Sequence, residues 1–149
     1  MVRRRSIVVG TDFSPAADRA LDRAAALASE LNASVAVLHA YEDPAGARLE
    51  SDPASLAETR LEETVSPLRA RYPLLRFDCV VRRGAPWDKL INVACELGAE
   101  MIVVGAGGER ARENSSFLGH VVTRLAAMSP RSVLVIPNAD ERLPAAPSR

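Results

Sequence analysis

Two glycine-punctuated segments interrupt the apolar pattern of this sequence, each directly after a run typical of a buried strand. The first is Gly10-Thr11-Asp12, and the second is Gly105-Ala106-Gly107-Gly108, which continues to Gly119 and His120. Glycines let the main chain approach a ligand closely and direct successive N–H groups at one anion. A helix beginning near Gly119 would add further donors for phosphate, and Asp12 could accept hydrogen bonds from a ribose or a base.

Both segments also have a simpler interpretation. Residues 105–108 could form an ordinary surface loop, and Asp12 could be a residue of a local turn or a helix cap. The spacing alone leaves both interpretations open. The positions of the two segments depend on the helices and strands that carry them.

Apolar periodicity predicts the elements that must position these segments. Short apolar runs indicate five strands, at residues 7–9, 35–40, 77–81, 101–104 and 133–136. Three-and-four spacing between them indicates four helices. The first two helices begin at a cap followed by proline, at Ser14-Pro15 and Asp52-Pro53, and the third begins at Pro86. Asn32 and Gly98 are expected to end helices, and Pro67 is expected to kink the second helix or end it early.

The same periodicity assigns the helix residues that face the core. The second helix should turn Leu56, Leu61, Val65 and Leu68 inward. The third should bury Leu90, Ile91, Ala94 and Leu97, and the fourth Leu118, Val121, Val122, Leu125 and Met128.

Strands that alternate with helices require a parallel sheet covered by helices on both faces. In such sheets ligands bind outside the carboxyl ends of the strands, where the strand order reverses. If the first three strands wind one way and the last two the other, the first and fourth strands are neighbours at the reversal. Both glycine segments would then face one crevice.

Composition limits the classes of partner. The chain has 149 residues, about one domain, with 48% hydrophobic residues and a formal net charge of zero. A nucleic-acid binder usually has a basic surplus, so we expect no nucleic-acid partner. Cys79 and Cys95 lack metal-ligand spacing and are expected to be buried thiols. We find no signal-peptide pattern and no apolar run near the length of a membrane span, and expect a cytoplasmic protein without a membrane partner.

Several stretches together resemble the universal stress protein family along almost the whole chain, from Ile7 to Pro137. They are IVVGTDFSPAADRAL, SVAVLHAY, the G-x-P of residues 84–86 before LINVACELGAEMIVVGAGG, and FLGHVVTRLAAMSPRSVLVIP. The resemblance implies an α/β fold of the adenine nucleotide alpha hydrolase-like type, a five-stranded parallel sheet ordered 3-2-1-4-5 with helices on both faces. It further implies one domain at residues 1–137 followed by a tail at 138–149, and a homodimer formed through the last strand, Val133–Ile136.

The ATP-binding branch of this family is marked by G-x2-G-x9-G-(S/T). Gly105-x2-Gly108 fits its first half, but ten residues separate Gly108 from Gly119, and His120 replaces the Ser/Thr. The missing hydroxyl removes one hydrogen bond, worth about 0.5–1.5 kcal/mol. His120 could replace it by donating to phosphate, or its ring could fill the pocket.

Carried over by position, the resemblance implies a set of nucleotide-binding residues. Near the base and ribose it places Gly10, Thr11, Asp12 and Ala40, along the adjoining wall Val104 and Gly105, and around the phosphates Gly108, Gly119, His120 and Val121. Arg110 and Arg112 could pair with phosphates or simply be solvated. His39 is expected to be a hydrogen-bonded histidine beside the core, and Trp87 to pack at a helix start.

Three functions are compatible with these residues. The first is an adenine-nucleotide-binding module, holding ATP with or without Mg²⁺, that senses or regulates in a stress response. The second is a dimeric adaptor of the same family that binds proteins and no nucleotide. The third, a slow ATPase or phosphotransferase, is disfavoured because the glycine loop lacks the GxxxxGK[ST] lysine and the sequence presents no catalytic or metal-ligating cluster.

Overall fold

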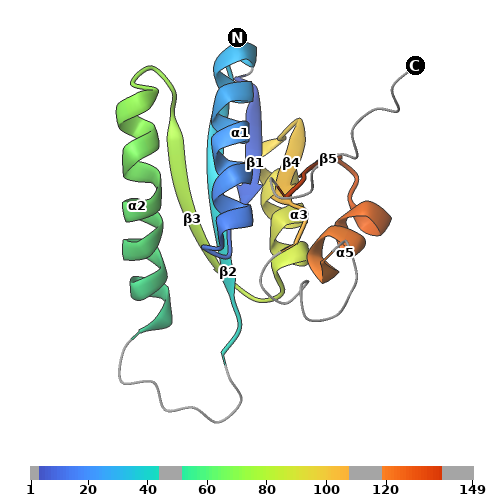
Figure 1. Ribbon diagram of the computed structural model, residues 1–149. Helices are drawn as coiled ribbons and strands as arrows, with labels where there is room; N and C mark the ends of the chain where they lie inside the picture. The colour runs from blue at the N-terminus through green and yellow to red at the C-terminus, as the bar shows by residue number, and fades with distance from the viewer. Residues whose placement is uncertain (1–3, 44–51, 108–118, 139–149) are drawn as a thin grey trace, which may run out of the picture.

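The computed structural model describes residues 4–43, 52–107 and 119–138 (Figure 1). Strands and helices alternate along them: β1 (Ser6–Gly10), α1 (Pro15–Leu31), β2 (Ser34–Tyr41), α2 (Pro53–Arg71), β3 (Phe77–Arg83), α3 (Pro86–Leu97), β4 (Met101–Gly105), α5 (His120–Met128) and β5 (Ser132–Ile136). The strands form one parallel sheet in the order β3-β2-β1-β4-β5. The predicted fold is confirmed, and β1 and β4 are neighbours where the strand order reverses.

The helix starts follow from the local residues that were expected to cap them. The Ser14 hydroxyl accepts from the Ala17 N–H at the start of α1, and Asp52 accepts from the Ala54 N–H at the start of α2. Asn32 and Gly98 end α1 and α3 in the left-handed conformation, with φ of 54° and 60°. These boundaries are local in origin, so they could be predicted without knowledge of the packing.

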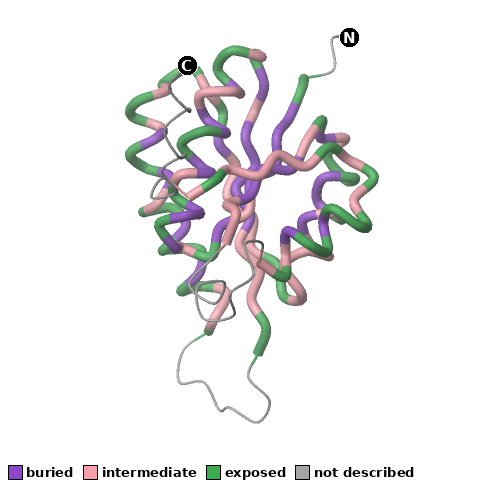
Figure 2. The backbone as a smooth tube through the Cα atoms, turned by 45° about the vertical axis from the view of Figure 1, so that its right-hand side comes forward, coloured by how far each residue is buried: buried purple, intermediate pink, exposed green. Residues whose placement is uncertain are grey.

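Two layers of helices enclose the sheet. One core cluster joins α1 and α2 to side chains of alternate strand positions, such as Val9 and Val37. The other joins α3 and α5 to the intervening positions, such as Val8 and Leu38. Figure 2 shows the resulting distribution, with the buried residues concentrated in the central strands and on the inner sides of the helices. Strands buried on both faces are the reason for their continuous apolar runs.

Three residues predicted to face the core do not. Leu56, Leu97 and Met128 are 58%, 47% and 52% exposed. The periodicity locates the centre of an apolar face but not its width, and these residues lie at its margins or near helix ends. Ala57 and Val93 are buried beside two of them.

Of the two outcomes expected at Pro67, the early end of the helix is wrong, and so is the expected burial of Cys95. Helix α2 does not end at Pro67 but continues to Arg71, because Leu68 is packed in the core and the Tyr72 N–H donates to its carbonyl at 2.8 Å. Cys95 is exposed rather than buried, since it lies on the outer side of α3, and Cys79 is half-buried on β3.

Among the described residues, no helix combines the length and apolar character that a bilayer crossing requires. The tail predicted at 138–149 lies outside them except for Asn138, whose Oδ1 accepts a hydrogen bond from Arg19 Nη2 at 3.2 Å.

Candidate functional site

The carboxyl ends of β1 and β4 lie side by side beneath the start of α1. Register pairs Val9 with Val103, so Gly10 and Val104 follow as neighbours. A Cβ on Gly105 would lie 2.8 Å from the Ala16 carbonyl oxygen, a separation that real side chains do not show. Glycine at this position therefore allows the first turn of α1 to rest directly on the end of β4.

A tight turn follows β1 and carries Asp12. The Thr11 N–H donates to Leu38 O at 2.9 Å, which ties the turn to β2. The Thr11 hydroxyl is buried and accepts from the Phe13 N–H at 3.0 Å, and Asp12 Oδ1 accepts from the Ser14 N–H at 3.0 Å. One carboxylate oxygen of Asp12 thus serves the turn, as the simpler interpretation expected. The side chain nevertheless remains exposed, so its second oxygen is open to a ligand.

His39 and Phe13 support this turn, and the part of Phe13 in it could not be predicted from the sequence. His39 Nδ1 lies 2.8 Å from Thr11 O, and because a carbonyl only accepts, Nδ1 must carry the proton. This confirms the expectation of a hydrogen-bonded histidine. The His39 and Phe13 rings lie 4.5 Å apart. Phe13 has φ +63°, a conformation for which an aromatic residue is no sequence signal.

Carboxylates gather on the β1 side of the site, with the Arg19 and Arg60 guanidinium groups beside them. The pKa of Asp18, in the first turn of α1, is raised by burial and by the neighbouring carboxylates of Asp22 and Asp12, against the lowering effect of Arg19 and Arg60. Clustered carboxylates repel phosphate but attract hydroxyl and amino donors. This side of the site suits the ribose or base end of a ligand.

The start of α5, at the other end of the candidate site, suits an anion such as phosphate. Its N-cap is Gly119, and none of the described side chains caps the helix, so with respect to these residues the N–H groups of its first turn can donate to an anion. The Gly119 N–H donates to Ala106 O at 3.2 Å, and the nearest described atom to a Cβ on Gly119 would be Gly107 Cα, at 3.8 Å. The helix start therefore lies against the segment that leaves β4, with His120 exposed on its first turn.

The structure brings most of the predicted residues to one edge of the sheet. The β1 turn reaches β4 through the contact between Ala16 and Gly105, and the β4 segment reaches α5 through Ala106 and Gly107. Val104 is buried, and Ala40 and Val121 pack against the same core cluster, so these three would meet a ligand mainly through their backbone. Three of the predicted positions, Gly108, Arg110 and Arg112, lie outside the described residues.

Trp87 is half-buried at the start of α3 and packs against the core, as expected, with the Arg124 guanidinium 5.4 Å from its ring centroid. Within residues 4–43, 52–107 and 119–138, no group of three or more His, Cys, Asp or Glu residues could hold a metal ion.

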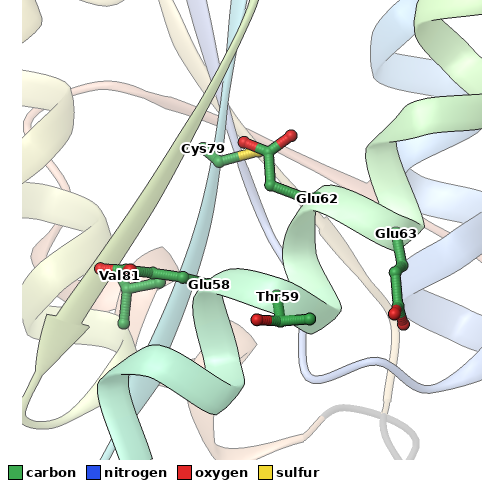
Figure 3. A pocket seen from close by; sticks show the side chains of 6 residues that line it. All are labelled: Glu58, Thr59, Glu62, Glu63, Cys79 and Val81. Carbon is green, nitrogen blue, oxygen red and sulfur yellow. The ribbon is translucent and has the colours of Figure 1, made fainter.

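A hollow of about 520 Å³ lies elsewhere, between α2 and β3 (Figure 3). None of the predicted site residues line it; its walls are Glu58, Thr59, Glu62, Glu63, Cys79 and Val81. Arg69 pairs with Glu62 and also donates to Phe77 O at 3.1 Å. The carboxylates here are therefore partly engaged with the protein itself.

Cys79 has a suppressed reactivity in this hollow. Burial, followed by the adjacent Glu62 carboxylate, raises the pKa of its thiol to about 11, against the weaker lowering effect of Arg69. Figure 3 shows the Glu62 carboxylate directed at the Cys79 sulfur. A thiol in this state is a poor nucleophile at neutral pH.

Comparison with known protein families shows to which family this chain belongs. The model of the universal stress protein family matches residues 3–137. The chain belongs to the universal stress protein family. No curated protein matches this universal stress protein.

Solved structures of this family share its fold. One is a universal stress protein in complex with cAMP, which is 26% identical, covers 91% of this chain and 98% of its own, and has a TM-score of 0.66. A second, from Archaeoglobus fulgidus in complex with dAMP, is 25% identical, with coverage of 91% and 99% and a TM-score of 0.68. A third, from Lactobacillus plantarum, shows the fold at 21% identity, 91% and 99% coverage, and a TM-score of 0.67.

Proposed function

We propose that this universal stress protein binds an adenine nucleotide at the carboxyl edge of its sheet. One observation carries the proposal: at the reversal of strand order, the Asp12 turn, the end of β4 and the uncapped start of α5 form one continuous edge. Ligands of open α/β sheets bind at this place. The complexes of two family members with cAMP and dAMP add support from the ligand side.

The charges of the edge suggest an orientation for the nucleotide. Asp12 would accept from the ribose or base, while first-turn N–H groups of α5 would donate to phosphate. His120, exposed on that first turn, would donate to phosphate as well. We propose ATP, with or without Mg²⁺, as the ligand and sensing or regulation in a stress response as the role.

Isothermal titration calorimetry of nucleotide-free protein with ATP, AMP and FMN tests this proposal. Adenine nucleotides should bind and FMN should not. Asp12→Ala should weaken binding roughly tenfold or more, because hydrogen bonds to a charged acceptor contribute about 1.5–3 kcal/mol. Glu30→Ala, which removes an exposed carboxylate from the last turn of α1, is the matched control and should bind normally.

A second variant tests the α5 side. Gly119 has an ordinary φ of −66°, and no described atom lies closer than 3.8 Å to an added Cβ, so Gly119→Val should fold but fill the approach to the helix start and abolish binding. Thr123→Val, one turn further along α5 and exposed, is its control. Absence of binding by the wild type would reject the nucleotide site and favour the protein adaptor.

We further propose a homodimer through β5, Val133–Ile136. This strand is an edge of the sheet, and its Val and Ile side chains are half-exposed. The opposite edge, β3, differs: Arg69 donates to Phe77 O and Arg82 to Val81 O, which occupies outward carbonyls. Light scattering of Val135→Lys, which should be monomeric, against Val81→Lys, which should remain dimeric, tests this assignment.

A further inference from the structure

Phe13 has a backbone conformation that an aromatic residue rarely adopts. Its φ is +63°, and within the described part of the chain the only other non-glycine residue with positive φ is Asn32, which ends α1. Asparagine visits this region readily, whereas a bulky side chain is strained there. Such strain persists where the surroundings enforce it and concentrates at functional sites.

The surroundings of the Phe13 ring are what enforce the conformation. The Arg60 guanidinium carbon, from α2, lies 4.4 Å from the ring centroid. The His39 ring, from β2, lies 4.5 Å away with a tilt of 38°. His39 is itself fixed by its bond to Thr11 O, and the Phe13 ring also packs against the core cluster of α1 and α2. Strand β2 and helix α2, both remote from the turn in the sequence, therefore hold the Phe13 side chain.

The turn so held is the one that carries Asp12. With Phe13 left-handed, the chain reverses so that Ser14 N–H reaches back to Asp12 Oδ1 while the Asp12 side chain stays exposed. We propose that Phe13, held between His39 and Arg60, is a positioning residue that fixes the Asp12 carboxylate for ligand binding. This inference rests on the proposed function, because it assigns Asp12 a role toward the nucleotide.

The competing explanation is that the ring only fills the core. The two differ in what they require of the backbone. Core filling needs the volume of the ring, so alanine should be at least as good a substitute as glycine. Positioning needs the left-handed conformation, which glycine adopts about as readily as any other and alanine does not. Glycine should therefore be the better substitute.

Titration of Phe13→Ala, Phe13→Gly and Phe13→Tyr with ATP separates the explanations. Without the ring, alanine leaves the left-handed state, and a turn competent in only a small fraction of molecules lowers the apparent affinity in proportion, by roughly 5- to 30-fold. Phe13→Gly should lose less, and Phe13→Tyr, which keeps the ring, should bind like the wild type. Equal affinities of the alanine and glycine variants, or weaker binding by glycine, would overturn the inference.

The Arg60 side of the stack has its own test. Arg60→Met keeps the aliphatic stem but removes the cation over the ring, so affinity should fall about two- to fivefold. Arg71→Met is the matched control, since Arg71 lies on the same helix and pairs with Asp22 on α1, away from the ring. Equal affinities of the two variants would contradict the role of Arg60.

A measurement without ligand tests the restraint of the turn by Phe13 separately from nucleotide binding. Amide hydrogen exchange by NMR reports the Ser14 N–H, which is protected by Asp12 only while the turn holds its conformation. Exchange at Ser14 should be faster in Phe13→Ala than in Phe13→Gly, and slowest in the wild type. If the wild type binds no nucleotide, the proposed function fails, yet this order would still support the turn's restraint by Phe13. Equal exchange in the alanine and glycine variants would overturn it.

Discussion

A single methyl group at Gly105 should destabilise this protein, because the carbonyl of α1 occupies the space that the methyl needs. The added Cβ would lie 2.8 Å from Ala16 O, 3.0 Å from Ala16 C and 3.2 Å from Ala16 Cβ. The nearest contact is with helix backbone, which cannot rotate away as a side chain can. Helix α1 and strand β4 must therefore separate.

The size of the effect follows from these contacts. Overpacking of this kind costs about 1–3 kcal/mol. The reduced freedom of the unfolded chain returns about 0.4–1 kcal/mol of this when glycine becomes alanine. The net loss for Gly105→Ala is up to about 2.6 kcal/mol, or up to about 10 °C in Tm for a chain of this length.

Gly119→Ala is the matched control. Among the residues that the structure describes, its Cβ would meet no atom closer than Gly107 Cα at 3.8 Å, so the expected cost is the poorer N-capping of alanine, about 1 kcal/mol. Urea unfolding followed by circular dichroism measures both variants. A Gly105→Ala protein as stable as Gly119→Ala, or more stable than the wild type, would refute the close contact between α1 and β4.

Three further predictions concern other parts of the molecule. At pH 8 iodoacetamide should alkylate Cys79 slowly, and the rate should rise about tenfold per pH unit toward the thiol pKa of about 11. Glu62→Gln should lower that pKa and so speed the reaction, which mass spectrometry measures. An unchanged rate in this variant would exclude the role of Glu62. Leu90→Ala should lower the free energy of unfolding by about 2–5 kcal/mol. A Cβ on Gly10 would lie 3.1 Å from Leu90 Cδ1, so Gly10→Ala should destabilise the Leu90→Ala protein less than it destabilises the wild type. Additive changes in the free energy of urea unfolding would contradict this coupling. Thr11→Val should cost about 1–2 kcal/mol in the same assay by leaving the Phe13 N–H unpaired, and full stability would mean that this turn does not need the hydroxyl.

Local signals in the sequence predicted the elements well. Ser14 followed by Pro15, and Asn32 at the other end of the helix, act through their own backbone and side chain, so the bounds of α1 could be read directly. Helix faces were less certain. Leu97 fits the apolar period of α3 yet is exposed, because only the packing of α3 on the sheet decides where its apolar face ends.

The candidate site was predictable in outline but not in detail. Alternating elements placed Gly10 and Gly105 at strand ends, and the family resemblance supplied the strand order that makes these ends neighbours. The contact of Gly105 with Ala16 depends on how closely α1 approaches β4, which no spacing reveals. The left-handed Phe13 was missed for a related reason: it is stabilised by Arg60 and His39, both remote in sequence, and overrides the residue's own preference.

NMR titration of the nucleotide-free protein with ATP, with and without Mg²⁺, shows both whether a nucleotide binds to this universal stress protein and which residues it contacts. We expect saturable changes in the amide chemical shifts of residues 10–14, 105–107 and 119–121, with little change along α2 and β3. No shifts at millimolar ATP, or shifts confined to the hollow between α2 and β3, would contradict it.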